Sequence, residues 1–219
     1  IRRIQAFHDR PGGRLDFGPT PFQMRNRGKR REVRLKKSTR VVIVDPDPRW
    51  AGMFADEKAR IVEAVAGLDA AVEHVGSTAV PGLPAKPTID ILVVVPDPAS
   101  GRKAVAPLTA IGYEFRGELG IPGRFYFSKG LRRTHHLHLY PRGHPEIARL
   151  LLFRDYLRAH PEAARAYADL KLALAERFPN DREAYTEAKS GFIKSIEEKT
   201  RALGGGSPNK IKIRRPRGS

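Results

Sequence analysis

The chain has 219 residues, and its 41 Lys and Arg outnumber its 24 Asp and Glu to give a formal net charge of +17. This length fits one sizeable domain or two small ones. The absence of cysteine excludes disulfides, iron–sulfur clusters, thiolate zinc sites and a cysteine nucleophile. Any metal would therefore be held by Asp, Glu or His, and a reducing cytoplasm is the simplest compartment.

The sequence predicts neither a membrane span nor a secretory signal. The longest apolar run, residues 89–95, is interrupted by Asp90 and falls far short of the roughly 20 residues that a bilayer span needs. The N-terminus is charged, without a following apolar block or a small-residue cleavage site. A start at Ile1 rather than Met suggests a fragment, a processed product or an expression boundary.

Most of the excess positive charge lies at the two ends of the chain. Residues 1–40 hold 13 Lys and Arg and 3 acidic residues, whereas residues 204–219 hold 5 Lys and Arg and no acid. Residues 41–203 are nearly balanced at +2. We therefore expect a basic, disordered arm at 1–40, one domain at 41–203 and a flexible basic tail at 204–219. These ends either bind RNA or DNA phosphates without sequence preference or remain solvated.

In chain order, the first part of the domain alternates between strand and helix. β-Branched residues predict a strand at 41–44, which is followed by a turn at two X-Pro pairs. Apolar residues at helical spacing predict a helix over 49–67, and a short strand is expected at 71–75. A β-rich run at 88–95 precedes a helix at 100–111.

The second part of the domain holds strands and then helices. Three strands joined by glycine-containing turns are expected at 112–116, 124–129 and 134–140. The final third is helical, with three separate helices. Their apolar stripes span 147–157, 167–178 and 185–196.

Local signals mark where these helices begin. The sequence His-Pro-Glu occurs at His144 and again at His160, and we interpret both as helix starts rather than metal ligands, because proline fits the first turn and glutamate complements the helix dipole. Asn180 and Glu183 have the spacing of a capping box for the last helix.

The candidate chemistry begins at Gly76-Ser77-Thr78, directly after a predicted strand. Glycine lets backbone amides approach a phosphate, and the serine hydroxyl hydrogen-bonds phosphate oxygens. Asp90, inside the next apolar strand, would hold a divalent cation against that phosphate. Gly-Ser turns are common, and the alternative is that Asp90 is a satisfied core residue, although burying a carboxylate without a partner is costly.

The segment around these residues resembles a known family. Residues 74–91 read His-Val-Gly-Ser-Thr-Ala-Val-Pro-Gly-Leu-Pro-Ala-Lys-Pro-Thr-Ile-Asp-Ile, which resembles the signature of the GrpB family, a branch of the nucleotidyltransferase superfamily. The similarity spans about residues 41–202 and omits both basic ends. Further motifs that resemble the family follow in the same order at 120–124, 134–139, 152–157 and 187–189.

The resemblance implies an α/β (α+β) fold: a nucleotidyltransferase-like mixed β-sheet with flanking helices and a C-terminal three-helix segment. Active nucleotidyltransferases bind two metal ions through an Asp-x-Asp or Asp-x-Glu pair and a further carboxylate. Asp90 matches the first carboxylate, but Leu92 stands two residues further on. The incomplete pair weakens the ordinary two-metal mechanism.

Two histidines offer a substitute for the missing carboxylate. Strand alternation places His136 and His138 on one face, opposite the core-facing Leu137. With Asp90 they would form a two-histidine, one-carboxylate set, which suits Mn²⁺, Fe²⁺ or Zn²⁺ better than Mg²⁺. A histidine acting as general base or contacting phosphate is equally open, and so is a half-exposed strand whose histidines only form hydrogen bonds.

Basic residues near these motifs are candidates for triphosphate contact. Lys86 and Arg124 are favoured because they belong to the family motifs, and Lys129 is a weaker candidate. Surface Lys and Arg are usually only solvated. Arg154 and Asp155 are expected to form a structural ion pair with other elements.

Three functions compete at this stage. The first is an enzyme that moves a nucleotidyl group from an NTP to an acceptor with a divalent metal such as Mg²⁺, Mn²⁺ or Zn²⁺. The second is a nucleotide-binding or accessory module, since GrpB-like domains also occur attached to dephospho-coenzyme A kinase. The chain lacks a Gly-x-x-x-x-Gly-Lys-Ser/Thr loop, so it is not expected to be that kinase itself. The third is nucleic-acid binding through the basic ends.

Overall fold

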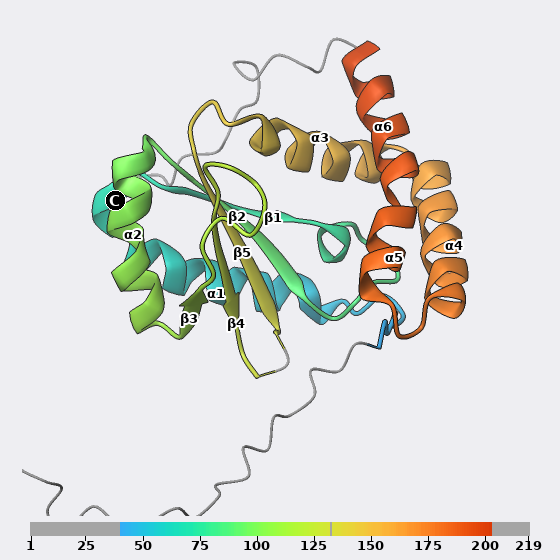
Figure 1. The fold of residues 1–219 in the computed structure, drawn as a ribbon, viewed down its shortest axis with the longest axis horizontal. Helices are drawn as coiled ribbons and strands as arrows, with labels where there is room; N and C mark the ends of the chain where they lie inside the picture. The colour runs from blue at the N-terminus through green and yellow to red at the C-terminus, as the bar shows by residue number, and fades with distance from the viewer. Residues whose placement is uncertain (1–39, 132, 203–219) are drawn as a thin grey trace, which may run out of the picture. The chain divides into compact units, whose positions relative to one another are not determined.

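The computed structural model describes residues 40–131 and 133–202 (Figure 1). Apart from Arg40, the predicted basic arm and tail lie outside these residues. The elements in chain order are α1 (Arg49–Ala64), η2 (Ala66–Leu68), β1 (Ala71–Val75), η3 (Ser77–Ala79), β2 (Ile89–Val95), α2 (Pro98–Ala110), β3 (Tyr113–Phe115), β4 (Phe125–Lys129), β5 (His135–Pro141), α3 (Pro145–Ala159), α4 (Pro161–Arg177), α5 (Arg182–Ala188) and α6 (Ser190–Ala202).

The strands form one mixed sheet in the order β1-β2-β5-β4-β3. Strands β2 and β5 are parallel, and the other three pairs are antiparallel. The parallel pair lies in the middle, where the register sets Asp90 beside His136 and Leu92 beside His138. This arrangement confirms the expected mixed sheet that carries the Gly-Ser turn and the aspartate strand.

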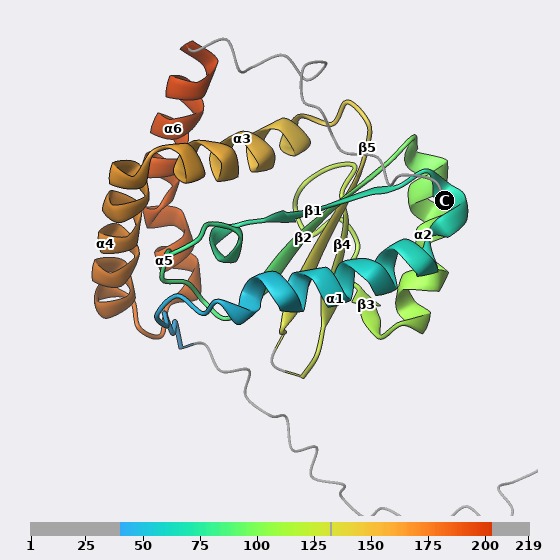
Figure 2. The ribbon, with the colours of Figure 1, turned by 180° about the vertical axis from the view of Figure 1, so that it is seen from behind.

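Helices cover the two faces of the sheet unequally. Helices α1 and α2 pack on the face formed by Ile91 and Val93 of β2 and Leu137 of β5. Helix α3 packs on the opposite face, where it contacts Leu92 and Val94. Figure 2 shows α1 running along the sheet from behind the view of Figure 1. Because β2 is buried on both faces, it is apolar at nearly every position.

The C-terminal helices pack beside the sheet rather than on its centre. Tyr167 of α4 stacks on Phe192 of α6 with ring centroids 5.0 Å apart. Val80 and Leu83, from the loop after β1, join Leu157 and Tyr167 in one apolar cluster. This cluster ties the helical segment to the loop that carries the Gly-Ser turn.

The predicted ion pair of Arg154 is confirmed. Its guanidinium bridges α3 and β1, with Nη1 at 2.9 Å from Glu73 Oε2 and donating to the His74 carbonyl at 2.9 Å. Its Nε donates to Asp155 Oδ1 at 2.7 Å. The two carboxylates and the carbonyl satisfy a guanidinium that is largely buried, as a buried charge requires.

Three local expectations were wrong. Residues 41–44 form no strand but only a single bridge, Val44 to Ala85. The last predicted helix is divided at Lys189 into α5 and α6. Asp181, not the Asn180–Glu183 pair, caps α5 by accepting hydrogen bonds from two backbone amides. Asp181 follows Asn180 by one residue and, as the N-cap, accepts hydrogen bonds from the first free amides of the helix, which is the role that the predicted capping box gave to Asn180.

The two His-Pro-Glu sequences begin α3 and α4 as predicted. His144 also caps α3, because its Nδ1 accepts a hydrogen bond from the Glu146 amide at 3.2 Å. Among the described residues, no helix is both long and apolar enough to cross a bilayer.

Candidate functional site

The candidate site lies where β1 ends and the parallel strands β2 and β5 begin. Asp90 is the second residue of β2, and the register pairs it with Val75, the last residue of β1, and with His136. Helix α3 closes this sheet face at Leu92 but leaves the Asp90 side chain 31% exposed. The carboxylate is therefore enclosed by neighbours and still reachable from solvent.

The Gly76-Ser77-Thr78 turn approaches the carboxylate closely. Gly76 has a φ of +74°, and a β-carbon placed on it would lie 2.5 Å from Asp90 Oδ2. Only glycine satisfies both the left-handed backbone and this contact. The chain then enters the 3₁₀ turn η3, which begins at Ser77. The turn and the aspartate predicted from the sequence are thus in contact.

Thr78 fixes the turn from inside the protein. Its hydroxyl donates to the Thr88 carbonyl at 3.3 Å, so the 3.0 Å contact with His74 Nε2 is made by a histidine N–H. His74 stacks on Phe54, and burial lowers its pKa to about 4, which keeps the ring neutral. Thr78 is therefore a positioning residue, whereas Ser77 is half-buried and interacts with the Tyr167 hydroxyl.

Both predicted histidines face Asp90. His136 Nδ1 lies 3.2 Å from Asp90 Oδ1, and His138 Nε2 lies 3.8 Å from the same oxygen, beyond hydrogen-bond distance. Burial raises the pKa of Asp90, but His136 and His138 outweigh it and hold this pKa well below its usual range. Asp90 is therefore ionised at neutral pH.

One nitrogen of this histidine pair lacks a partner. His136 Nε2 is buried and has no hydrogen-bond partner among residues 40–131 and 133–202. A proton on Nδ1, donated to Asp90, leaves this Nε2 with a free lone pair. A buried nitrogen without a hydrogen-bond partner lowers the stability of the folded chain, and this one belongs to a histidine that contacts Asp90.

A group of cations lies on the helical side of the carboxylate. The ammonium groups of Lys86 and Lys189 lie 4.3 and 4.4 Å from the centroid of the Tyr185 ring. Burial, together with the charges of Arg182 and Lys189, lowers the pKa of Lys86 to about 8. Burial also lowers the pKa of Lys189, while Asp90 opposes that shift. We call Lys86, Arg182 and Lys189 the cation cluster.

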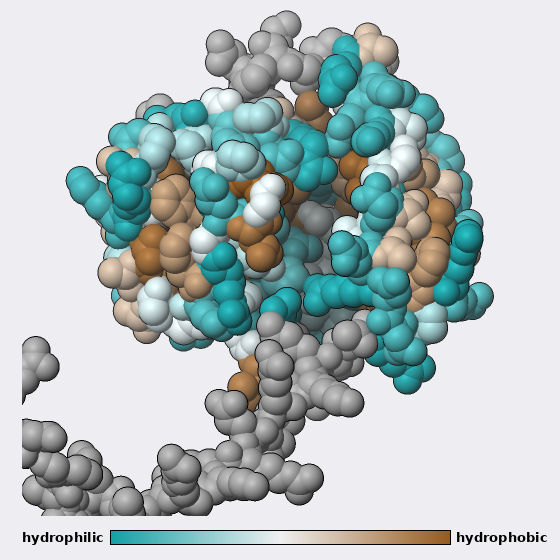
Figure 3. Space-filling view, viewed as in Figure 1, coloured by the Kyte–Doolittle hydropathy of each residue, from teal (hydrophilic) through white to brown (hydrophobic). Residues whose placement is uncertain are grey.

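The cation cluster has an excess of positive charge. Among the described residues, none of its three members forms a salt bridge with an acidic side chain. The buried Lys171 adds a further amine nearby, and burial together with the charge of Lys189 lowers its pKa to about 7. Figure 3 shows a hollow in the surface between the sheet and the C-terminal helices. Such a surface favours an anion.

The residues present do not form a three-donor metal site. Within the described ranges, no group of three or more His, Asp or Glu side chains is arranged to hold an ion. His136 uses Nδ1 on the carboxylate and its Nε2 is buried, so Asp90 and His138 are the accessible donors. This fits Mg²⁺ or Mn²⁺ that takes its other ligands from substrate phosphates and water, since Mg²⁺ is usually held by one or two carboxylates.

Two of the predicted basic residues are held by other contacts. Arg124 is buried, and its guanidinium donates to the carbonyls of Glu118 at 3.0 Å and Leu119 at 2.6 Å. It also lies 5.0 Å from the Tyr126 ring, which neighbours His138. Arg124 therefore braces the loop beside the site. Lys129 lies on the opposite sheet face, paired with Glu57 at 2.6 Å, and so does not reach the candidate site.

Sequence reasoning missed Arg182, Tyr185 and Lys189 as site residues. Lys189 belongs to the motif at 187–189, for which the sequence predicts no role in the site. Tyr185 belongs to the apolar stripe at 185–196. Tyr185 is 1% exposed, so that assignment holds while its ring also packs against two ammonium groups. The signal that could have indicated a site residue is Lys189 itself, a lysine within a family motif at the end of a helix.

Fold and geometry together define a mixed α/β domain with an ionised carboxylate and, in electrostatic interaction with it, a cation cluster that forms no salt bridge among the described residues. Residues 40–199 match the GrpB family, described as GrpB protein. The UPF0157 protein of Pseudomonas aeruginosa is 46% identical over 162 residues, or 72% of this chain and 66% of that protein. YqkA, a UPF0157 protein of Bacillus subtilis, is 43% identical over 73% of this chain and 47% of YqkA. This chain thus spans about two thirds of the first relative and half of the second.

A solved structure of a GrpB protein also matches this chain. The crystal structure of GrpB from Enterococcus faecalis matches with a TM-score of 0.70 and 38% identity, and the match covers 74% of this chain and 99% of that chain. A dephospho-CoA kinase of Mycolicibacterium paratuberculosis is 31% identical over 180 residues, which cover 70% of this chain and 44% of the kinase. The chain belongs to the GrpB family.

Proposed function

We propose that this protein binds a nucleoside triphosphate in the hollow at Asp90 and transfers its nucleotidyl group to the hydroxyl of an acceptor. The observation that carries this proposal is an ionised carboxylate in contact with a glycine turn and in electrostatic interaction with Lys86 and Lys189, members of a cluster of three cations that forms no salt bridge within the described residues. A polyphosphate with a divalent ion complements both halves of such a site.

Each residue has a proposed part in binding. The turn at Gly76 and Ser77 would receive phosphate oxygens through the backbone and the serine hydroxyl. The cation cluster would neutralise the rest of the triphosphate. Asp90 would hold Mg²⁺ or Mn²⁺, which when bound offsets negative charge on the phosphates and takes its other ligands from phosphate oxygens and water, so that His138 keeps its lone pair.

The transfer itself requires one proton acceptor. The acceptor oxygen would attack the α-phosphorus and form the new P–O bond while the bond to the leaving pyrophosphate breaks. The hydroxyl proton would pass to a histidine nitrogen of the site, for which His138 Nε2 is the better placed, since His136 Nε2 is buried. His136 would act as a positioning residue that orients the carboxylate through its 3.2 Å contact.

Thermal unfolding of the full chain with each NTP, with and without Mg²⁺ or Mn²⁺, tests the proposal. A ligand that binds only the folded state at 100 times its Kd stabilises it by about 2.7 kcal/mol. We expect such a shift with metal and NTP, its loss in Asp90→Asn and its reduction in Lys189→Met. Lys199→Met, an exposed lysine on α6, is the matched control. An NTP-induced shift of equal size in Asp90→Asn would contradict the proposal.

A second candidate function is an accessory module for dephospho-coenzyme A kinase. It is favoured by the 31% identity to the mycobacterial kinase over 180 residues, a match that covers less than half of the kinase. Under this proposal, the purified kinase and this chain should associate, and association should not require Asp90. Calorimetric titration of the kinase with wild-type chain and with Asp90→Asn distinguishes the two candidates.

A further inference from the structure

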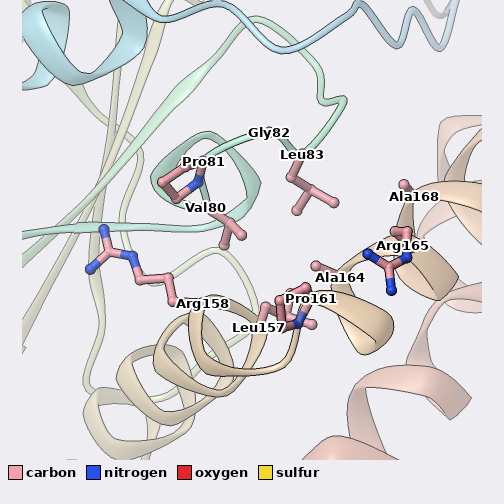
Figure 4. A pocket seen from close by; sticks show the side chains of 10 residues that line it. All are labelled: Val80, Pro81, Gly82, Leu83, Leu157, Arg158, Pro161, Ala164, Arg165 and Ala168. Carbon is pink, nitrogen blue, oxygen red and sulfur yellow. The ribbon is translucent and has the colours of Figure 1, made fainter.

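A second cavity lies behind the Gly-Ser turn, between the loop 80–83 and the junction of α3 and α4 (Figure 4). Its volume is about 480 Å³, within the range of small-molecule sites. None of its lining residues belongs to the Asp90 site or to the cation cluster. The lining residues are Val80, Pro81, Gly82, Leu83, Leu157, Arg158, Pro161, Ala164, Arg165 and Ala168.

The walls of this cavity belong to the packed interior. Val80, Leu83 and Leu157 are 3%, 1% and 1% exposed, and they form one apolar cluster with Tyr167. The opposite wall consists of small side chains on α4, such as Ala164 and Ala168. Because these three side chains are almost fully buried, they form a fixed floor, and the accessible apolar lining comes from Pro81, Pro161 and the two alanines.

Two arginines flank the apolar walls, one on each side in Figure 4. Arg158 is anchored, because its Nε donates to the Ala79 carbonyl at 2.9 Å, and its Nη1 lies 3.9 Å from Asp155 Oδ1, at the limit of an ion pair. Arg165 is exposed and forms no salt bridge with any residue that the structure describes. Of the described residues that line the cavity, none is acidic.

We propose that this cavity is a binding site for a small amphipathic anion, with an aliphatic body held by Pro81, Pro161 and the α4 alanines and a carboxylate or phosphate held by Arg165. The aliphatic lining without aromatic rings fits an alkyl chain better than a nucleobase. An anion is selected because the charged groups at the rim are both guanidinium ions, which pair with carboxylates and phosphates.

Calorimetric titration of the full chain with octanoate and with octyl phosphate, both below their micellar concentrations, tests the proposal. We expect one molecule bound per chain, and the comparison of the two probes identifies the preferred head group. Octylammonium and acetate should bind at least tenfold more weakly, because one carries the wrong charge and the other lacks the apolar body. Equal binding of octylammonium, or no binding of either anionic probe, overturns the proposal.

Variants then locate the binding. Ala168→Phe fills the cavity and should abolish octanoate binding, whereas Ala166→Phe makes the same change on the exposed face of α4 and should leave it unchanged. Arg165→Gln should weaken octanoate at least about fivefold. Asp90→Asn should have no effect, so this result does not depend on the nucleotide proposal. Octanoate affinity that survives Ala168→Phe refutes the assignment, provided that circular dichroism shows this variant to be folded.

Discussion

One face of the sheet contains both a packed core and an open site. At Leu92 the face is closed by α3, and the side chain is 0% exposed. At Asp90, two residues earlier on the same strand, the face is open and the side chain is 31% exposed. The comparison teaches that the position of one helix, rather than any change in the strand, separates core from site.

The same comparison explains the missing second carboxylate. Leu92 occupies the position of the second acid of an Asp-x-Asp pair, but it packs with Val94, Ile147 and Leu151. A carboxylate there would be buried among apolar side chains without a partner. The cation cluster on the other side of Asp90 instead faces the open half of the face. Its charge is placed where phosphates would enter under the proposed function.

The largest expected effect comes from placing an acid on the closed half. Leu92→Asp should lower the free energy of unfolding by more than about 3 kcal/mol, because it buries an unpaired charge. Leu92→Met, which keeps the volume, should cost less than about 1.5 kcal/mol. Urea denaturation of both variants measures the difference. If Leu92→Asp were nearly as stable as Leu92→Met, the closed half would not be a packed core.

The second prediction concerns His74, beneath the turn. Burial lowers its pKa from 6.5 to about 4. Between pH 6.5 and 4 the unfolded chain binds a proton at His74 that the folded chain does not bind. The free energy of unfolding should therefore fall by up to about 3 kcal/mol as the pH falls from 6.5 to 4. His74→Gln keeps a hydrogen-bonding partner for Thr78 and should flatten the dependence. Urea denaturation between pH 7 and 5 measures both slopes, and equal slopes would contradict this assignment.

The third prediction isolates the close approach of the turn to Asp90. Gly76 and Gly82 have the same φ of +74°. A β-carbon placed on Gly76 would lie 2.5 Å from Asp90 Oδ2, whereas one placed on Gly82 would have no described neighbour within 4 Å. Both alanine variants should lose about 1 kcal/mol for the left-handed backbone. Gly76→Ala should lose a further 1–2 kcal/mol, on the order of an overpacked contact, and should also weaken any NTP-induced shift. Equal losses in the two variants would mean that the turn and the carboxylate are not in contact.

The smallest expected effect is in the cation cluster. Lys189→Met removes a cation whose pKa is lowered by burial, so the free energy of unfolding should change by less than about 0.5 kcal/mol, with any change toward higher stability. Binding of inorganic triphosphate by the same variant should fall about tenfold. Urea denaturation and calorimetry give the two readouts. A loss of stability above about 1 kcal/mol would mean that Lys189 is a structural residue rather than part of an anion site.

Much of the fold was predictable because its signals are local. A β-rich run marked β2, glycine turns separated β3, β4 and β5, and His-Pro-Glu marked the starts of α3 and α4. The failures also have local causes. Residues 41–44 have strand-like composition but pair only through Val44, and the apolar stripe at 185–196 continues across the break at Lys189. Propensity and periodicity report neither strand partners nor a break between two helices of similar pattern.

The sequence by itself determined which residues are candidates for chemistry: the Gly76–Thr78 turn, Asp90, and two histidines that strand alternation places on one face. Only the tertiary structure decided how they meet. It brought His136 and His138 to the same carboxylate oxygen, closed the face at Leu92, and added Lys189 from the break between α5 and α6, 99 residues beyond Asp90 in the chain. The physical reason is that strand alternation is set by the local backbone, whereas an electrostatic site depends on which distant charges the packing of helices brings together.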